Sequence, residues 1–461
     1  MSAANPSAAL PWRTALVIGL GESGRAAARL LARLGVEVRA YDQRADAPVP
    51  EGVLPYVGAP TIPEVAVRGI DLLVLSPGVP PSHARALAER LAPAAAIHGE
   101  MSLALDLFRR LVGDPPTVLV TGTNGKSTVT ALTGALLEAG GLRPFVGGNL
   151  GVPLSSAVLE RVDGGGAAPG ALVLECSSYQ LETMTKVRAD VGMVLNVTPD
   201  HLDRYPTMEA YADTKARVFA DLGAGGLGLL DAGDPFTPRL RQAVPPARLT
   251  LVDAPPAAEG ASIVGEGPGR LLRLRSGEAF ERGLLGLAGR HNSKNALFAL
   301  EAARHLGVDA DACAAGLRAF VGLPHRMVLV RELAGVTYYD DSKATNVASV
   351  LASLGGFDRR FVLIAGGRAK GDDLTPLREL LARQGRALVA LGESRERFAA
   401  LAEDLVPVAR AATMDEAVAE ARALAQPGDA VVLSPACSSF DLFRNYAERG
   451  ETFARLVDAL T

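Results

Sequence analysis

The stretch TVLVTGTNGKST, residues 117–128, constrains this chain more than any other part of the sequence. Residues 117–120 form a short apolar and β-branched run, which is typical of a strand buried on both faces. A glycine-containing turn follows, and Lys126 opens a run of good helix formers through Leu136. A strand, a glycine turn and a helix in this order direct backbone N–H groups and a helix N-terminus at an anion. We therefore predict a phosphate-binding loop at residues 121–128.

The side chains of this loop favour a nucleoside triphosphate. We expect Lys126 to place a positive charge beside the β- and γ-phosphates, and the Ser127 hydroxyl to bind Mg²⁺. Val120 stands where the generic phosphate-loop pattern has its first glycine, so this is the shorter GxxGK[ST] form. The alternative interpretation is a glycine turn that only caps a helix. The residues of the loop predicted to hold ATP are Gly122, Thr123, Asn124, Gly125, Lys126, Ser127 and Thr128.

Length and composition describe a soluble, enzyme-like chain. With 461 residues, the chain is long enough for about three domains. The formal net charge of −4 gives no reason to expect nucleic acid or an anionic membrane as a partner. We find no signal peptide and no long apolar run, and the three cysteines are far apart, which fits reduced thiols. We therefore expect a cytoplasmic protein that does not insert into a membrane, and we predict a monomer.

Residues 1–112 are predicted to form the first domain. The strand 15–18 runs into the turn GLGESG at 19–24, and a second strand ends at Asp42. A GxGxxG turn with an acid about 20 residues further on is the dinucleotide fingerprint, so an NAD-dependent dehydrogenase is one alternative. Any diphosphate suits such a turn equally well, and no hydride-transfer site is evident downstream. A further strand, 71–75, leads into Ser76, Pro77 and Gly78, a second turn at the edge where ligands bind.

Residues 113–322 are predicted to form the central domain. The acid Glu175 ends the apolar strand 171–174, where a direct or water-mediated Mg²⁺ ligand is needed beside a phosphate loop. His201 lies between two aspartates after an expected strand at 191–197, and we favour a metal or phosphate role over a structural one. Lys215 falls in a helix expected at 208–222, and by spacing alone it is an ordinary solvated lysine.

Asn292 and Asn295 stand three residues apart at the start of a predicted helix in the same domain. Side chains at this spacing share one helix face, and their amides suit a base or a ribose. Simple N-capping by Asn292 is the alternative, and it is compatible with that role. We therefore predict that both asparagines lie at a nucleotide.

Residues 323–461 are predicted to form the last domain. Strands alternate with helices here, and polar turns follow the strands, which is typical of a doubly wound sheet with its ligand site at the carboxyl edge. Arg326, Lys343, Lys370 and several hydroxyl groups fall at that edge. Cations with hydroxyls suit a small substrate that bears carboxylates. The alternative is that these are dispersed, solvated cations.

Along almost its full length, the sequence resembles the Mur ligase family of peptidoglycan synthesis. The short phosphate loop, ECSS at 175–178 and DH at 200–201 are shared with the folylpolyglutamate synthetase relatives of that family. DSKATN at 341–346 and SPACSSFD at 434–441 resemble the members that add D-glutamate. One departure is Arg368-Ala369 ahead of Lys370, where relatives often have an acid or a glycine. The other segments that carry the resemblance are GGNLG at 147–151, GRHNSKNALFA at 289–299 and GLPHRM at 322–327.

The resemblance implies three α/β domains. The N-terminal domain is expected to be Rossmann-like and to hold a UDP moiety, so the GxGxxG turn is reassigned from a nicotinamide cofactor to uridine diphosphate. The central domain is expected to be an ATPase-like parallel or mixed sheet, and the C-terminal domain a Rossmann-like, doubly wound sheet for the amino acid. The implied activity is ATP-dependent ligation of D-glutamate to UDP-N-acetylmuramoyl-L-alanine through an acyl phosphate, with two Mg²⁺ ions. The alternatives are another Mur-type or folylpolyglutamate-type ligase, a dehydrogenase, or a non-catalytic nucleotide switch.

The resemblance also implies roles for individual residues. The catalytic residues are Lys126, Glu175, His201 and Lys215, and the metal ligands are Ser127, Glu175, His201 and Lys215, the last after carbamylation of its amine. The UDP-sugar contacts are Leu20, Ser23, Asp42, Arg44, Ser76, Gly78 and Asn149. The further nucleotide contacts are Asn292, Asn295, His325, Arg326 and Asp341. The residues around D-glutamate are Lys343, Thr345, Lys370, Ser439, Phe440 and Tyr446.

Overall fold

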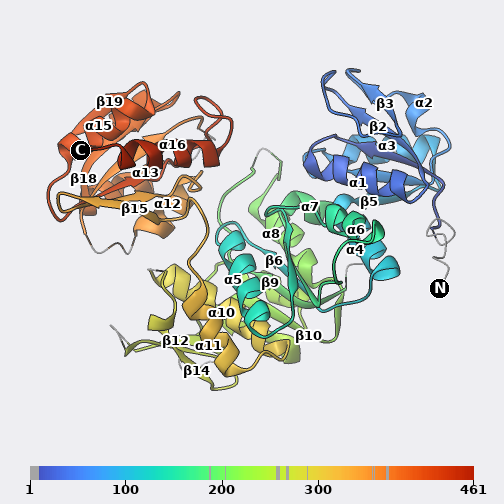
Figure 1. The fold of residues 1–461 in the computed structure, drawn as a ribbon, viewed down its shortest axis with the longest axis horizontal. Helices are drawn as coiled ribbons and strands as arrows, with labels where there is room; N and C mark the ends of the chain where they lie inside the picture. Colours follow the sequence, from blue (N-terminus) through green and yellow to red (C-terminus); the bar gives the residue numbers. More distant parts are fainter. Residues whose placement is uncertain are drawn as a thin grey trace. The chain divides into compact units, whose positions relative to one another are not determined.

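The computed structural model describes residues 10–185, 188–202, 204–255, 260–265, 269–287, 289–355, 357, 359–369 and 373–461. The chain divides into two compact units, and each is considered by itself. The first consists of residues 1–285 and 295–320, and it contains two of the three sheets; the second consists of residues 286–294 and 321–461 (Figure 1). None of the helices in the described residues combines the length and apolar character needed to cross a membrane.

The N-terminal sheet has five parallel strands in the order β3-β2-β1-β4-β5. Its apolar runs are buried because helices cover the sheet, as in other parallel sheets. The strand order reverses between β1 and β4, which is the position where ligands bind in open α/β sheets. The elements are β1 (Thr14–Ile18), α1 (Glu22–Arg33), β2 (Glu37–Asp42), β3 (Val53–Val57), α2 (Glu64–Val67), β4 (Leu72–Leu75), α3 (Pro81–Leu91) and β5 (Ala96–Gly99).

The central sheet has nine strands in the order β14-β13-β12-β11-β10-β9-β6-β8-β7. It is parallel from β7 to β12 and antiparallel from β12 to β14, so it is mixed. Its strands are β6 (Thr117–Thr121), β7 (Pro144–Gly148), β8 (Ala171–Glu175), β9 (Ala189–Val194), β10 (Leu222–Asp231), β11 (Leu249–Val252), β12 (Gly260–Val264), β13 (Leu271–Arg273) and β14 (Ala279–Glu281). Strand β6 lies between β8 and β9, which places the phosphate loop at the middle of the parallel part.

Helices pack around this sheet and connect it to the N-terminal domain. Helix α4 leads from β5 into β6, and it packs against α6. Helix α5 follows the phosphate loop and packs against α11. The main helices of this part are α4 (Glu100–Leu111), α5 (Lys126–Ala139), α6 (Leu154–Val162), α7 (Ser178–Glu182), α8 (Met208–Ala216), α9 (Thr237–Leu240), α10 (Arg290–His305) and α11 (Ala310–Ala319).

In the described residues, the C-terminal sheet has six strands in the order β15-β16-β20-β17-β18-β19, of which only β15 runs antiparallel to its neighbour. Separate apolar clusters bury its two faces, one including residues of α12, α13 and α14 and the other residues of α15 and α16. The strands are β15 (Val328–Leu333), β16 (Val336–Asp340), β17 (Phe361–Gly366), β18 (Gly385–Leu391), β19 (Val408–Ala411) and β20 (Ala430–Leu433). The helices are α12 (Val347–Leu354), α13 (Thr375–Gln384), α14 (Arg395–Ala402), α15 (Met414–Leu424) and α16 (Tyr446–Asp458).

The predicted fold class, three α/β domains with a mixed central sheet, is confirmed. The domain boundaries at 112/113 and 322/323 stay predictions. Two element bounds were wrong. Helix α8 ends at Ala216 and not at 222, because a short 3₁₀ turn follows and Leu222 already pairs with Ala189 in the sheet. Strand β9 ends at Val194 and not at 197, because its continuation turns to hold the phosphate loop.

Glu100 is a buried carboxyl group at the start of α4, and it joins that connecting helix to α6. Its side chain is 1% exposed, and Oε1 accepts a hydrogen bond of 2.9 Å from the backbone N–H of Ser155. Burial raises the pKa of Glu100 above its ordinary value, and the hydrogen bond from the Ser155 N–H offsets only part of this effect. The folded chain therefore favours the neutral form of this carboxyl group.

We predict that Glu100→Gln gains stability relative to wild type as the pH rises from acid to neutral. As pH rises above 4.5, the ordinary pKa of a glutamate, the unfolded chain releases this proton before the folded chain does, so the group's contribution to stability falls with pH. Glutamine cannot ionise, yet its carbonyl oxygen still accepts the Ser155 N–H. The stability gain of the variant should therefore grow between about pH 4 and about pH 8 in urea titrations.

Glu100→Ala is the matched control, because it removes the acceptor as well as the charge. It should lower the free energy of unfolding by about 1–3 kcal/mol at low pH, where the carboxyl group is neutral. If Glu100→Gln and wild type differed by the same free energy of unfolding at every pH, the proposed cost of ionising the buried Glu100 would be contradicted.

Candidate functional site

The phosphate loop joins β6 to α5 in a conformation that requires both of its glycines. Gly122 has φ +155°, and a Cβ atom there would lie 3.0 Å from Leu195 Cβ, on the segment after β9. Gly125 has φ +83°, and its Cβ would lie 2.9 Å from Asn295 Oδ1. The N-cap residue of α5 is Gly125, which has no side chain to cap the helix. Uncapped N–H groups at a helix N-terminus are the usual partners of a phosphate.

Asn196 holds this loop in place. Its Oδ1 accepts hydrogen bonds from the backbone N–H groups of Thr123 (3.1 Å) and Asn124 (2.8 Å), and its Nδ2 donates to the Asn124 carbonyl (3.0 Å). Thr123 also exchanges hydrogen bonds with the backbone of Thr198. Asn196 was not among the predicted site residues, although it lies two residues after the buried strand β9, at the level of the phosphate loop.

Two lysines converge on the carbonyl of Gly122. Lys126 Nζ donates to it at 3.0 Å, and Lys215 Nζ donates to it at 2.8 Å. Lys215 is 1% exposed and lies 4.3 Å from the centre of the Tyr211 ring, so the solvated-lysine alternative is wrong. Burial, and then the charge of Lys126, lower the pKa of Lys215 well below its ordinary value. This environment favours a neutral amine at Lys215.

Glu175 and Asn149 meet beside the loop. Glu175 ends β8 and is 2% exposed, and its Oε1 accepts a hydrogen bond of 2.6 Å from Asn149 Nδ2. Its Oε2 is buried without a hydrogen-bond partner among the described residues. An unpartnered buried carboxylate oxygen is costly, and a cation would satisfy it. The structure thus pairs a residue predicted for the UDP-sugar with one predicted for a metal.

The residues around Glu175 fit a Mg²⁺ ion held mainly by a nucleotide. No group of three or more His, Cys, Asp or Glu side chains is arranged as a metal cage in the described part of the chain. Mg²⁺ commonly takes only one or two protein carboxylates, with phosphate oxygens and water completing its shell. The buried carboxylate of Glu175 and the hydroxyl of Ser127, which is 5% exposed, suit such a site.

His201 belongs to an aromatic cluster near the loop. Its backbone φ is +56°, and its Nδ1 lies 2.9 Å from the Tyr179 hydroxyl and 3.7 Å from Asp200 Oδ1. The guanidinium of Arg204 lies 4.6 Å from the centre of the Tyr179 ring. Tyr179, which sequence analysis did not single out, therefore orients the histidine. Asp203, the other acid beside His201, lies outside the described residues.

The turn after β1 is hydrogen-bonded to Asp42, the last residue of β2. Its Oδ2 accepts the Leu20 N–H at 2.7 Å, and its Oδ1 accepts the Arg44 N–H at 2.9 Å. Burial would raise the pKa of Asp42, but these hydrogen bonds and the Arg44 guanidinium outweigh it and hold the pKa below its ordinary value. Ser76 lies under the turn, because a Cβ on Gly19 would be 2.8 Å from Ser76 Cβ. Ser23 and Gly78 lie in the first turn of α1 and in the turn after β4.

The segments after β16 and β20 carry the residues predicted to surround an amino acid. Lys343 Nζ lies 3.7 Å from the centre of the Tyr446 ring. Ser439 is 3% exposed, whereas Phe440 is 64% exposed. Thr345 is partly buried one residue before the N-cap of α12. Lys370 lies outside the described residues.

The predicted nucleotide contacts are divided between the two units. Asn295 lies at the phosphate loop, and Asn292, His325, Arg326 and Asp341 belong to the second unit. His325 Nδ1 lies 2.6 Å from Asp340 Oδ2, and Asp341 Oδ2 accepts a hydrogen bond of 2.7 Å from the Ser434 hydroxyl. Burial raises the pKa of Asp341 to about 7. Both side chains are thus held by their own domain.

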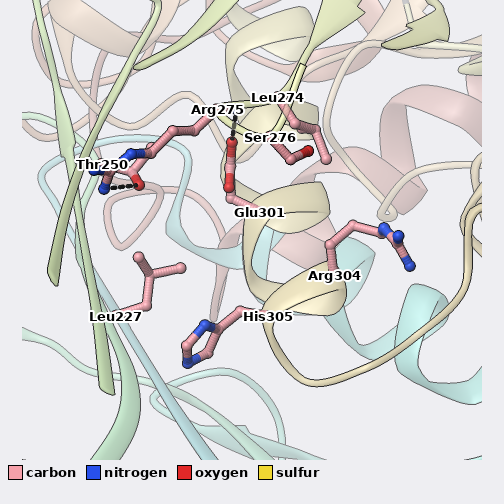
Figure 2. Close-up of a pocket in the computed structure, with 8 residues that line it drawn as sticks. All are labelled: Leu227, Thr250, Leu274, Arg275, Ser276, Glu301, Arg304 and His305. Atoms are coloured by element: carbon pink, nitrogen blue, oxygen red, sulfur yellow. Dashed lines mark hydrogen bonds between the residues drawn. The ribbon is translucent and has the colours of Figure 1, made fainter. Parts of the chain in front are cut away.

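A separate pocket of about 460 Å³ opens on the central domain beside the last turns of α10 (Figure 2). It contains none of the predicted site residues, and its charged groups already have protein partners. Glu301 Oε1 accepts the Arg275 N–H at 2.6 Å, and Arg304 Nε donates to Glu278 at 2.6 Å. The residues that line it are Leu227, Thr250, Leu274, Arg275, Ser276, Glu301, Arg304 and His305. Its polar groups therefore serve the structure of the domain.

This fold and site define a class of protein: three α/β domains, with a short phosphate loop in the middle domain. The chain belongs to the Mur ligase family. Residues 13–98 match the MurD-like N-terminal domain, residues 120–303 the Mur ligase middle domain, and residues 325–437 the glutamate ligase domain of Mur ligases. Membership in a ligase family argues against the dehydrogenase alternative.

Individual relatives support this placement. UDP-N-acetylmuramoylalanine–D-glutamate ligase of Nitrosospira multiformis is 40% identical over 98% of this chain and 96% of the relative. The protein of the same name from Anaeromyxobacter dehalogenans is 43% identical over 96% of each chain. The structure of MurF from Acinetobacter baumannii matches with a TM-score of 0.61 at 18% identity, over 96% of this chain and 90% of that one, which supports the fold alone.

We predict that Asn196→Ala weakens nucleotide binding about tenfold. The substitution removes the side-chain partner of the Asn124 N–H and carbonyl, whereas the Thr123 N–H keeps its hydrogen bond to the main-chain carbonyl of residue 196. The loop must then be ordered when the ligand binds, which costs about 1.4 kcal/mol. The dissociation constant for ADP, measured by titration calorimetry, tests this expectation.

Gln384→Ala is the matched control. It removes a side-chain amide that donates to the Phe357 carbonyl at 3.0 Å in the C-terminal domain, and it should leave ADP affinity unchanged. If Asn196→Ala bound ADP as tightly as this control, the role given to Asn196 would be refuted.

Proposed function

We propose that this chain is an ATP-dependent ligase that joins D-glutamate to UDP-N-acetylmuramoyl-L-alanine. The observation that carries this proposal is the identity of 40–43% to ligases of that name over nearly the full length of the chain. The match includes the glutamate ligase domain, where Mur-type relatives with other amino acids would be expected to differ most. Another Mur-type or folylpolyglutamate-type ligase is the remaining alternative.

The reaction must first activate a carboxylate, because a carboxylate is a poor electrophile for an amine. The γ-phosphoryl group of ATP is transferred to the alanine carboxylate of the UDP-sugar, which gives an acyl phosphate and ADP. The amine of D-glutamate attacks the acyl carbon, and the tetrahedral intermediate collapses to an amide with release of phosphate. Lys126 stabilises charge on the transferring phosphoryl oxygens. We propose that His201, which Tyr179 orients, accepts the proton of the attacking amine at the stage when its ring is not bound to a metal ion.

Residues 122–128 hold the triphosphate, with Asn292, Asn295, His325, Arg326 and Asp341 as the further nucleotide contacts. Two Mg²⁺ ions would be held by Ser127, Glu175, His201 and a carbamylated Lys215. When bound, Mg²⁺ neutralises charge on the phosphate oxygens. Oε2 of Glu175, which has no hydrogen-bond partner in the described part of the chain, and the burial of Lys215 support this set.

The other two substrates are assigned to the outer domains, at residues 1–112 and 323–461, with residues 113–322 as the central domain. Leu20, Ser23, Asp42, Arg44, Ser76, Gly78 and Asn149 contact the UDP-sugar. Lys343, Thr345, Lys370, Ser439, Phe440 and Tyr446 surround D-glutamate, whose carboxylates suit the two lysines. The protein acts as a cytoplasmic monomer, without a nucleic acid or membrane partner.

We predict that phosphate release from ATP requires both UDP-N-acetylmuramoyl-L-alanine and D-glutamate. L-Lysine and meso-diaminopimelate should not replace D-glutamate, because their extra amine is not complementary to a cationic site. Lys126→Ala should lower the rate by about 10²–10³-fold, as expected when charge stabilisation of the transition state is lost. An equal response to all three amino acids, or undiminished ligation by the Lys126 variant, would refute the proposal.

We also predict that ligation depends on dissolved CO₂. A neutral Lys215 amine can attack CO₂ and lose a proton, which yields the carbamate, and bicarbonate should restore any activity lost in CO₂-free buffer. Native mass spectrometry should detect one bound CO₂ in wild type and none in Lys215→Ala. Full activity with no detectable CO₂ adduct would exclude the modification and leave Lys215 as an amine.

A further inference from the structure

Arg449 is a fully buried arginine in the first turns of α16. It is 2% exposed, and among the described residues its hydrogen bonds go only to neutral oxygen atoms. Nε donates to Ser342 Oγ at 2.9 Å, Nη2 donates to the Ser342 carbonyl at 2.8 Å, and both Nη atoms lie 3.2 Å from the Cys437 carbonyl. The negative charges of Asp441 and Asp340 act on this guanidinium, but burial outweighs them and lowers its pKa to about 10. Burying a guanidinium whose hydrogen bonds go to neutral groups is costly, so this arrangement calls for a specific reason.

The partners of Arg449 lie on two different loops of the C-terminal domain. Ser342 comes directly before Lys343 in the segment after β16, and Cys437 comes two residues before Ser439 in the segment after β20. Strands β16 and β20 are paired and parallel, so both segments leave the same edge of the sheet. The planar, forked donor of one guanidinium therefore fixes the spacing between them.

Two further contacts extend this arrangement. The Ser342 hydroxyl donates to the Tyr446 carbonyl at 2.8 Å, one turn before Arg449, and Lys343 Nζ lies over the Tyr446 ring. A third loop also meets the guanidinium, because a Cβ on Gly367 would lie 3.4 Å from Arg449 Nη1 and 2.4 Å from the Ser438 carbonyl. All three loops that carry the proposed amino-acid contacts thus pack on one side chain.

We propose that Arg449 is the positioning residue that sets the length selectivity of the amino-acid site. By fixing the distance between the Lys343 loop and the Ser439 loop, it shapes the site to accept the five-carbon dicarboxylate D-glutamate. The same spacing disfavours the shorter D-aspartate. Its burial keeps it from contacting the substrate itself. The inference rests on the proposed function of this site, and it adds the residue that determines substrate length.

The test compares Arg449→Lys and Arg449→Ala with wild type in the phosphate-release assay. Lysine keeps a charge but cannot bridge two carbonyls as the fork does. We expect KM for D-glutamate to rise about tenfold or more, as for a misplaced substrate-binding group, with KM for ATP and for the UDP-sugar within about twofold of wild type. The ratio of kcat/KM for D-glutamate over D-aspartate should fall in both variants.

Chemical rescue separates positioning from a general loss of packing. Guanidinium ion fits the space left by Arg449→Ala and can donate to both carbonyls, so millimolar guanidinium should lower KM for D-glutamate towards the wild-type value. Methylammonium cannot bridge the loops and should not. Ser342→Ala, which removes the acceptor of Nε and keeps the main chain, should raise the same KM by about threefold, and this variant carries the test if Arg449→Ala does not fold.

Arg331→Ala is the matched control. Arg331 donates to the carbonyls of Asp458 (2.9 Å) and Leu460 (2.8 Å) at the other end of α16, so its loss weakens the same helix without touching the loops. An equal rise in KM for D-glutamate in this control, or no change in the Arg449 and Ser342 variants, would overturn the inference. A wild-type enzyme that does not require D-glutamate would instead refute the proposed function.

Discussion

The close approach of two backbones at the ends of β6 and β9 is the constraint on which the rest of the site depends. Leu195 N–H donates to the Thr121 carbonyl at 2.9 Å, and Gly122 has no side chain to hold the next residues apart. The loop therefore sits against the segment after β9, where Asn196 can reach its N–H groups. The Gly122 carbonyl then faces both Lys126 and Lys215. Parallel pairing of neighbouring strands thus brings together charges that are distant in the sequence.

Buried polar side chains fix the spacing of the loops that the sheets bring to one edge. A parallel sheet brings its loops to one edge, but it leaves their spacing loosely specified. Here Asn196 joins the loops after β6 and β9, Glu175 meets Asn149 between β8 and β7, and Arg449 joins the loops after β16 and β20. Burying such groups is costly unless they are hydrogen-bonded, so each one strongly favours a single loop arrangement. Preorganisation of this kind is what binding and catalysis require.

The sequence predicted the local elements of the fold, but it did not predict the contacts between segments that are distant along the chain. Apolar runs such as 117–121 and 430–433, each followed by a small-residue turn, predict strands and their carboxyl-edge loops without further information. Asn196 and Arg449 could not be found in this way, because their partners lie about 72 and 107 residues away and leave no periodic pattern. The end of α8 was misplaced for a similar reason, since pairing of Leu222 with Ala189 overrides helix propensity there. The burial of Lys215 likewise depends on the tertiary fold.

The GxGxxG turn shows why a motif can fix a shape without fixing a ligand. A Cβ on Gly24 would lie 1.8 Å from the Gly19 carbonyl oxygen, so this glycine serves the packing of α1 against β1. Asp42, which would bind a ribose hydroxyl in a dinucleotide site, here accepts the N–H groups of Leu20 and Arg44 with its two oxygens. These hydrogen bonds hold the turn closed, and its backbone N–H groups suit any diphosphate. The choice between a nicotinamide cofactor and a nucleotide-sugar must therefore come from residues outside the motif.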